Sequence, residues 1–313
     1  MEKKYISDFE IGEMVETTVV VRRVSTKEYQ KGKFLSLELG DKTARIDGVM
    51  WNGFETLEKE IHAGDVVQVS GKVTQYQDKR QIQVQKVLRL KENEINKLDF
   101  INKSEKDPAA LVKELNQNIA AVKDPMIKGL LDKFFQDEKI QAAYQEAPAG
   151  KLWHHAYLGG LLEHSLSVLK FCHLACDLYP ILSRDLLTAG ALLHDIGKIV
   201  EYSVTTFIDF SDVGRLKGHL VIGAQIVEKA MDEIAGFPEQ SRNKIIHLIL
   251  SHQGKQEMGS PVVPQTLEAM VLHCADEMDS KTNALVRIYE KEHDQGKNWS
   301  EYIQLLGRYL YLK

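Results

Sequence analysis

Apolar and polar residues alternate over the first ninety positions of the chain. The alternation occupies five short runs, at residues 15–24, 34–39, 43–51, 66–76 and 80–90. A period of two is typical of half-buried β-strands, and the glycines and aspartates between the runs suit turns between antiparallel strands. The segment between the third and fourth runs has helical spacing instead. The pattern therefore predicts five strands, with one short helix between the third and the fourth.

This order of elements is that of an OB-fold, a small Greek-key barrel that often binds oligonucleotides. Alternation in the second run places its leucines inside the barrel and Phe34 outside, and in the third run it places Arg45 and Trp51 on the same outer side. Strands two and three carry the binding face of such a barrel, where aromatic rings stack on bases. We expect this face to bind a single strand of nucleic acid. Phe34, Trp51 and Tyr76 would stack on its bases, and Arg45 would bind its phosphates. The alternative for Trp51 and Tyr76 is that they cap the barrel or pack against a second domain.

The apolar spacing changes from two to three and four at Pro108, which indicates helices from there onward. Residues 91–107 are charged and lack strong periodicity, so we interpret them as a linker, anchored by Leu98, Phe100 and Ile101. The expected architecture is multidomain: an all-β OB-fold barrel over residues 1–90, the linker over 91–107, and an all-α domain over 108–313.

The composition is that of an ordinary globular protein. A net charge of −5 argues against a protein that coats duplex nucleic acid by bulk charge. The 3 cysteines have no CxxC spacing, which indicates reduced thiols and no thiolate zinc site. The N-terminus lacks an apolar signal segment, and no window of about 18 residues is free of charge. We therefore expect a cytoplasmic protein without a membrane partner.

Histidines are concentrated in the predicted helical part. Of the 11 histidines in the chain, 9 lie between His154 and His273, several of them in apolar segments where an unpaired polar group is costly. The strongest local signal is the run His194-Asp195-Ile196-Gly197-Lys198 at the end of an apolar helix, where both His194 and Asp195 can turn toward one metal ion. Further candidate ligands lie on separate helical segments: His164, His219, His252 and Asp276.

The order His, His-Asp, Asp over residues 151–283 resembles the HD-domain superfamily of metal-dependent phosphohydrolases, and the two intervening histidines resemble its members that hold two metals. The resemblance implies one ion held by His164, His194, Asp195 and Asp276, with Asp195 bridging to a second ion held by His219 and His252. Nitrogen and carboxylate ligands without thiolate suit Mn²⁺, Co²⁺, Fe²⁺ or Zn²⁺, and we expect Mn²⁺.

Two such ions would generate a hydroxide and clamp the phosphate oxygens during in-line attack. Lys198 follows Asp195 by one helical turn and would steady the developing negative charge or the leaving oxygen. Asp195 and Lys198 are therefore the predicted catalytic residues.

The wider resemblance covers essentially the full chain. A barrel, a linker and an HD domain that contains His154-His155-Ala156-Tyr157, then Gly159-Gly160-Leu161-Leu162-Glu163-His164, resemble the YhaM-type 3′–5′ exoribonucleases. The segments 214–219 and 259–261 fit that family too. Gln253 departs from it, because a histidine is expected after His252; this puts in doubt a substrate role at that position, not the metal site. The resemblance implies an exonuclease that releases 5′-mononucleotides from single-stranded RNA, with single-stranded DNA as a further candidate substrate.

Four residues near the predicted ligands are candidates for substrate contact. His154 and His155 precede the helix of His164 and would touch the scissile phosphate or the terminal sugar, or else pack the helix start. Arg215 and Lys217 flank His219 and would bind phosphate.

Two other functions compete with this prediction. A nucleotide or cyclic-nucleotide phosphohydrolase would share the ligand set, but it has no need of a strand-binding barrel. A nucleic-acid-binding factor for plasmid or replication DNA, with incidental hydrolysis, is disfavoured by the complete ligand set. The apolar, aromatic segment 302–311 has helical spacing, and we expect it to pack within the chain, with burial in a homo-oligomer as the alternative.

Overall fold

The computed structural model describes residues 3–30 and 32–313, and its internal contacts divide the chain into two compact units. One unit contains the residues up to Asn102 together with Val204–Ile208, and the other contains Lys103–Ser203 and Asp209–Lys313. The division falls inside the predicted linker, because residues 91–102 group with the first unit and 103–107 with the second.

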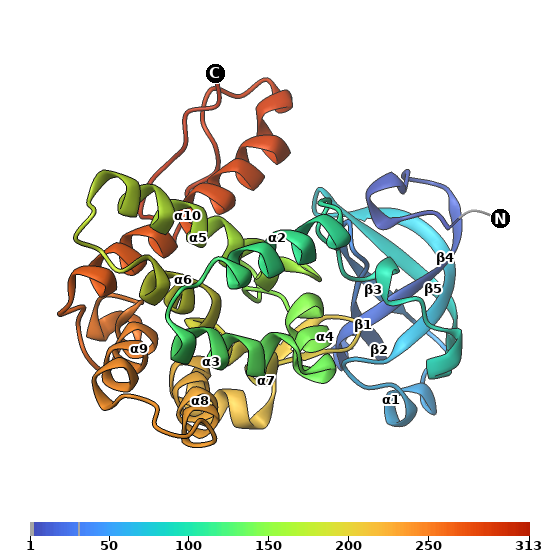
Figure 1. The fold of residues 1–313 in the computed structure, drawn as a ribbon. Coiled ribbons are helices and arrows are strands. Elements are labelled where there is room, and N and C mark those ends of the chain that lie inside the picture. Colours follow the sequence, from blue (N-terminus) through green and yellow to red (C-terminus); the bar gives the residue numbers. More distant parts are fainter. Residues whose placement is uncertain (1–2, 31) are drawn as a thin grey trace. The chain divides into compact units, whose positions relative to one another are not determined.

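The first unit is a closed barrel of five strands (Figure 1). Its elements are β1 (Met14–Tyr29), β2 (Gly32–Gly40), β3 (Arg45–Met50), α1 (Leu57–Glu60), β4 (Val66–Tyr76) and β5 (Lys79–Arg89). Around the barrel the order is β1-β2-β3-β5-β4, and all neighbours are antiparallel except β3 and β5, which are parallel. The predicted strands, and the helix between the third and the fourth, are confirmed as an OB-fold.

The barrel interior is apolar because alternate residues of each strand point inward. Leu35, Leu37 and Leu39 of β2 are buried, and the residues between them face outward. After β5 the chain makes the short turns η2 (Glu92–Glu94) and η3 (Lys97–Asp99). Phe100 and Ile101 are buried after these turns and anchor this part of the predicted linker, whereas the third predicted anchor, Leu98, is 40% exposed.

The second unit is mainly helical. Its helices are α2 (Pro108–Ala120), α3 (Pro125–Phe135), α4 (Glu138–Glu146), α5 (Gly160–Leu178), α6 (Arg184–Leu193), α7 (Lys198–Glu201), α8 (Asp212–Asp232), α9 (Glu239–Ser251) and α10 (Leu267–Glu292). Asp107, Asp124 and Asp137 precede the first three and accept hydrogen bonds from their free backbone N–H groups, which fixes where these helices start.

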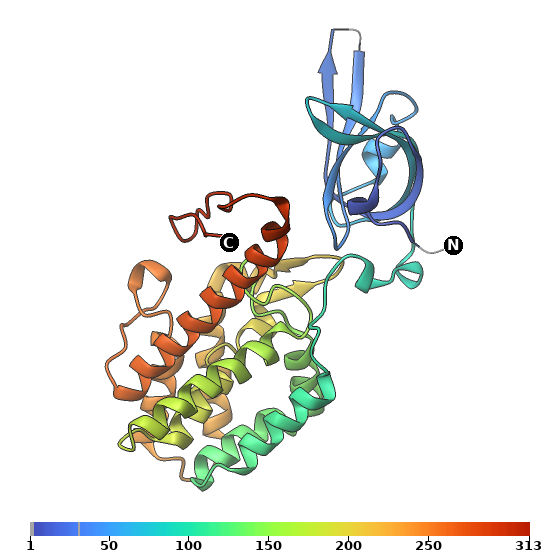
Figure 2. The ribbon, with the colours of Figure 1, turned by 90° about the horizontal axis from the view of Figure 1, so that it is seen from above.

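A continuous apolar core joins these helices, with Leu115, Leu130, Leu169, Leu192 and Leu248 fully buried in it. Figure 2 shows α5 and α10 side by side, which agrees with their close contact. In the described part of the chain, no helix combines the length and the apolar character needed to cross a membrane.

Helices dominate the second half, as predicted, although it also contains loops and a little β-structure. A short strand pair, β6 (Tyr202–Val204) and β7 (Ile208–Phe210), follows α7.

The C-terminal segment after the turn η5 (His293–Gln295) is also not helical, and it folds back on itself through isolated bridges between Trp299 and Tyr311 and between Ile303 and Arg308. In this extended backbone, residues spaced by three and four do not share one face. Tyr302 and Tyr309 are therefore exposed, and the prediction that this aromatic segment packs inside the chain is wrong for them.

Candidate metal centre

The six predicted ligands lie together in the helical unit, although they come from distant parts of the sequence. They are His164 on α5, His194 and Asp195 just after α6, His219 on α8, His252 at the end of α9, and Asp276 on α10. The side chains of His164, His194 and His252 are fully buried, and that of Asp195 is almost so.

The Asp195 carboxylate lies at the centre of this cluster and divides it in two. Its Oδ2 atom is 3.5 Å from Nε2 of His164 and 3.4 Å from Nε2 of His194. Its Oδ1 atom is 3.5 Å from Nε2 of His219 and 3.5 Å from Nε2 of His252. Each carboxylate oxygen therefore faces two imidazole nitrogens, with His164 and His194 at Oδ2 and His219 and His252 at Oδ1.

Asp276 belongs to the first half of the cluster. Its Oδ1 atom is 3.2 Å from Nε2 of His164, and Asp276, His164 and His194 present ligand atoms within 4.8 Å of one another. Burial acts to raise the pKa of Asp276, but the hydrogen bond from His164 outweighs burial and holds the pKa well below its ordinary value. Asp276 is thus a carboxylate at neutral pH, as a metal ligand must be.

The other ring nitrogen of each histidine is bound to an oxygen acceptor. Nδ1 of His194 lies 2.9 Å from the carbonyl oxygen of Ala191, and Nδ1 of His252 lies 2.8 Å from that of Ile249. In a neutral ring, an N–H that donates to a carbonyl must sit on Nδ1, which leaves the lone pair on Nε2. Both lone pairs then point at Asp195.

Carboxylates play the same part for the remaining two histidines. Nδ1 of His164 donates to Oδ2 of Asp279 at 2.7 Å, and Nδ1 of His219 donates to Oε1 of Glu201 at 3.1 Å. Such outer carboxylates fix the tautomer and orientation of metal-binding histidines. Asp279 and Glu201 were not predicted from the sequence, although the spacing of Asp276 and Asp279 places both on one face of α10.

Two glycines allow α8 to approach the turn that follows Asp195. A Cβ atom on Gly197 would lie 2.1 Å from the carbonyl oxygen of His219, so only glycine fits between this turn and α8. Gly218 has a φ of 71° and kinks α8 immediately before His219. The glycine of the His194-Asp195-Ile196-Gly197 run therefore serves to bring His219 within reach of Asp195.

Lys198 contacts Asp195 directly. Its Nζ atom donates to Oδ2 of Asp195 at 2.5 Å, and its side chain is buried. Burial acts to raise the pKa of Asp195, but the positive charge of Lys198 and the hydrogen bonds around the carboxylate outweigh it and hold that pKa well below its ordinary value. The ammonium group of Lys198, which was predicted to be catalytic, is therefore hydrogen-bonded to the carboxylate of Asp195.

The arrangement fits a divalent metal site. Among the described residues, Oδ1 of Asp195 and Nε2 of His219 are buried without a hydrogen-bond partner. The Nε2 atoms of His164 and His194 are only 3.2 Å apart, and in two neutral rings both carry lone pairs with no hydrogen to share between them. Unpaired buried acceptors that face one another are costly, and a cation among them removes the cost.

Without a metal, the His164 ring is expected to take up a second proton. Burial acts to lower its pKa, but hydrogen bonds to Asp276 and Asp279 outweigh burial and raise it from 6.5 to about 9. A raised pKa in the folded protein stabilises the metal-free fold fully below about pH 6.5, and this contribution disappears as the pH rises through about 9.

We therefore predict that metal-free protein loses about 3 kcal/mol of stability between pH 6.5 and 9. Urea unfolding of chelator-treated protein at several pH values measures this. His164→Gln should flatten the dependence, and an equally steep loss in that variant would assign the effect to other groups.

Three of the four predicted substrate residues of this unit have partners: His155, Arg215 and Lys217. Both ring nitrogens of His155 are engaged, Nδ1 with the Tyr157 hydroxyl at 2.8 Å and Nε2 with Asp279 at 2.9 Å. His155 therefore has no ring nitrogen free for a substrate, which favours the alternative that it packs the start of α5. Arg215 pairs with Asp209 at 2.9 Å and Lys217 contacts Gln225 at 3.3 Å, and both side chains are exposed.

The predicted aromatic residues of the barrel form a cluster. The ring centroids of Phe34 and Trp51 are 4.9 Å apart, and those of Tyr29 and Trp51 are 5.1 Å apart. Tyr29 was not predicted to belong to this surface. Trp51 is 40% exposed, so one part of its surface is free to stack. Tyr76 is exposed at the end of β4, and Arg45 pairs with Glu38 at 3.1 Å.

Comparison with known families matches both units. Residues 161–281 match the model of the HD domain, and residues 17–90 match that of an OB-fold nucleic acid binding domain. The chain joins an OB-fold barrel to an HD domain. HD domains are metal-dependent phosphohydrolases. All six predicted ligands lie within the HD match, and His155, which contacts Asp279, precedes it. This is the architecture of a metal-dependent nucleic-acid hydrolase.

Solved structures with some similarity include two replication proteins. The second OB-fold domain of replication protein A from Methanococcus maripaludis is 25% identical, with 28% of this chain and 95% of that chain covered and a TM-score of 0.25. A replication protein A heterotrimer bound to ssDNA is 22% identical, with coverages of 29% and 69% and a TM-score of 0.23. An aspartyl tRNA synthetase from Entamoeba histolytica is 10% identical, with coverages of 79% and 58% and a TM-score of 0.26.

Proposed function

We propose that this protein is a 3′–5′ exoribonuclease that hydrolyses single-stranded RNA to 5′-mononucleotides at a two-metal centre. The observation that carries the proposal is the position of Asp195, whose two carboxylate oxygens each face a pair of imidazole Nε2 atoms. A carboxylate with a separate set of nitrogen donors on each oxygen is the arrangement that two neighbouring cations require.

The ligands divide between the two halves of the cluster. His164, His194 and Asp276 would hold one ion, His219 and His252 would hold the second, and Asp195 would serve both. Two bound ions supply an activated nucleophile and neutralise the charge on a phosphate during in-line displacement. The donors are imidazole nitrogens and carboxylate oxygens, which favours Mn²⁺, with Co²⁺, Fe²⁺ and Zn²⁺ as the other candidates.

The protein's own residues set the charge and geometry of the site. Asp279 and Glu201 hold the rings of His164 and His219 so that Nε2 faces inward. Lys198 neutralises part of the charge that Asp195 and Asp276 bring into the buried site. With its ammonium held near the centre, Lys198 would also stabilise negative charge that develops on the phosphate.

The barrel supplies a reason for a single-stranded substrate. The exposed face of Trp51, supported by Phe34 and Tyr29, can stack on a base only if that base is free of a complementary strand. A mononucleotide substrate would need no such surface. The choice of RNA and the 3′–5′ direction follow from the resemblance to the YhaM-type enzymes.

A time course with RNA labelled at its 5′ end tests the proposal. In the presence of Mn²⁺, the label should move down a ladder that shortens from the 3′ end, with 5′-mononucleotides as the released product. A copy with a 3′-phosphate and a duplex of the same sequence should be degraded more slowly. Release of the label in the first step, or no cleavage of any strand by metal-loaded protein, would overturn the proposal.

Replacement of Trp51 by alanine is expected to weaken the binding of single-stranded RNA. Loss of a stacked base costs about 1–3 kcal/mol, so the Kd should rise by about 5- to 150-fold. Fluorescence anisotropy with a labelled RNA, in the absence of metal to prevent cleavage, measures the change. Trp299→Ala is the matched control, because Trp299 is exposed in the other unit. Equal effects of the two substitutions would argue against a specific stacking surface.

A further inference from the structure

Two adjacent histidines, His154 and His155, lie in the loop between α4 and α5, and their rings point in different directions. The ring planes are 86° apart, with centroids separated by 6.1 Å. His155 has a φ of 42°, in the left-handed region that residues other than glycine rarely adopt. Such strained residues cluster at functional sites. Here the strained backbone separates the two neighbouring rings.

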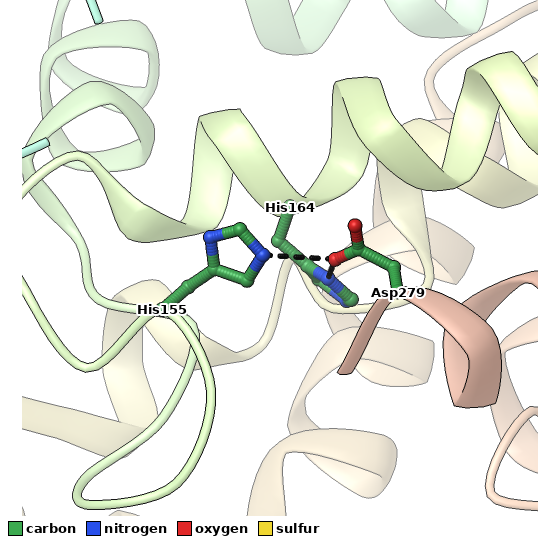
Figure 3. A group of neighbouring side chains, drawn as sticks. All are labelled: His155, His164 and Asp279. Atoms are coloured by element: carbon green, nitrogen blue, oxygen red, sulfur yellow. Dashed lines mark hydrogen bonds and ion pairs between the residues drawn. The ribbon is translucent and has the colours of Figure 1, made fainter. Parts of the chain in front are cut away.

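The ring of His155 belongs to the scaffold around His164. Figure 3 shows that Oδ2 of Asp279 lies between the two rings, 2.9 Å from Nε2 of His155 and 2.7 Å from Nδ1 of His164. The backbone N–H of His155 also donates to Oδ1 of Asn283 at 2.9 Å. His155 therefore positions Asp279, which in turn orients His164.

The ring of His154 lies against the metal cluster instead. Its centroid is 5.1 Å from that of His164. Both of its ring nitrogens are shielded from water, and neither has a hydrogen-bond partner among the described residues. Burial lowers the pKa of His154 well below its ordinary value, and the charge of Lys198 lowers it further. An imidazole ring has at least one N–H donor, and no described group accepts one from His154.

An unpaired imidazole in such a place indicates a missing partner, because buried polar groups are nearly always hydrogen-bonded. No described side chain or backbone group, including the neighbouring His155, His164 and Lys198, forms a hydrogen bond with either ring nitrogen of His154. The partner must therefore be brought to the cluster. A phosphate oxygen is the acceptor that the substrate of this site presents.

We propose that His154 contacts the substrate directly, by donating a ring N–H hydrogen bond to an oxygen of the scissile phosphodiester. The inference rests on the proposed function and adds a residue to it. His154 acts as a fixed donor aimed at the phosphate while His155, its neighbour in sequence, holds a metal ligand in place. Removal of one donor directed at a reacting oxyanion typically lowers kcat by about 10² to 10³-fold.

The test compares His154→Ala and His154→Gln with a control, His247→Ala. Glutamine keeps an N–H donor, and His247 is a histidine of the same unit whose Nε2 accepts from the backbone of Gln265, outside the cluster. Three quantities are measured for each Mn²⁺-loaded protein: bound metal by mass spectrometry, kcat and KM on single-stranded RNA, and the Kd for adenosine 5′-monophosphate by calorimetry.

We expect His154→Ala to keep the metal content of the unaltered protein, to lose about 10² to 10³-fold in kcat and to bind the mononucleotide about tenfold more weakly. His154→Gln should recover part of both losses, and His247→Ala should behave like the unaltered protein. Loss of metal in His154→Ala would make His154 a ligand and overturn the proposal. Unchanged kcat and Kd, or equal losses in the alanine and glutamine variants, would overturn it as well.

The mononucleotide measurement separates this inference from the proposed function. If the unaltered protein does not degrade RNA, the exoribonuclease proposal fails, and the phosphate contact is still tested by mononucleotide binding and by hydrolysis of bis(p-nitrophenyl) phosphate. That small diester needs no strand-binding surface, so its hydrolysis depends on the helical unit and not on the barrel.

Discussion

Asp195→Asn is expected to abolish hydrolysis and to remove bound metal from both halves of the cluster. Asp195 is the residue that faces all four imidazole Nε2 atoms, and an amide in its place loses the negative charge and turns one donor group toward two of them. Metal ions contribute several kcal/mol to the transition state of phosphate hydrolysis. Activity should therefore fall by at least about 10³-fold.

A matched control keeps this result from being confused with unfolding. Asp232→Asn removes an exposed carboxylate at the end of α8, and it should leave metal content and activity unchanged. The Asp195→Asn protein should also bind single-stranded RNA with the affinity of the unaltered protein, because the barrel is a separate compact unit. Substantial hydrolysis by Asp195→Asn would show that the cluster is not the hydrolytic site.

Removal of divalent ions is expected to stop hydrolysis and to lower the Tm of the helical unit by about 5–10 °C. Ions present at about 100 times their Kd stabilise a fold by about 2.7 kcal/mol. In a domain of about 200 residues, each kcal/mol moves the Tm by about 2–4 °C. Differential scanning calorimetry before and after chelation measures the shift, and an activity assay on the same samples measures the loss of hydrolysis.

The choice of ion restored after chelation provides the control. Mn²⁺ should recover both the Tm and the activity, whereas Ca²⁺ should recover neither, because Ca²⁺ prefers six to eight oxygen ligands and this cluster offers mainly nitrogen. The Tm of Asp195→Asn should not respond to the chelator. A Tm and an activity that survive chelation in the unaltered protein would contradict a metal-dependent site.

The barrel could be predicted closely from the sequence because its signal is local. Alternation along one strand decides which side chains are inside, and the leucines of β2 and the outward positions of Phe34 and Trp51 follow from that alone. Tyr29 could not be predicted as part of the aromatic cluster. Its contact with Trp51 depends on the length of β1, which continues to Tyr29 because it pairs there with β2. The length of a strand is set by its partner as well as by its own sequence.

That six His and Asp residues gather in one cluster could be predicted from the sequence, but the carboxylates that contact their outer ring nitrogens could not. His194 and Asp195 form a recognisable run, and the other four residues stand out as polar groups in apolar helices. Asp279 and Glu201 have no such signal, since acidic residues are ordinary on a helix. Their roles arise only when α10 packs on α5 and when α7 meets α8.

Adjacent residues could be assigned different roles only from the structure. His154 and His155 are equivalent candidates in the sequence, and the left-handed backbone at His155 separates them. Segment 302–311 was misassigned for a related reason, because helical spacing of aromatics is informative only where the backbone is a helix. In both cases the positions of the side chains depend on the backbone conformation, which the spacing of residues in the sequence does not reveal.

The most direct test of the central claim is a crystal structure of the Mn²⁺-soaked protein with anomalous scattering recorded for manganese. We predict two anomalous peaks, one at each carboxylate oxygen of Asp195. The first should lie beside His164, His194 and Asp276, and the second beside His219 and His252. A single peak, or manganese bound elsewhere with the cluster unchanged, would contradict a centre in which Asp195 serves two ions.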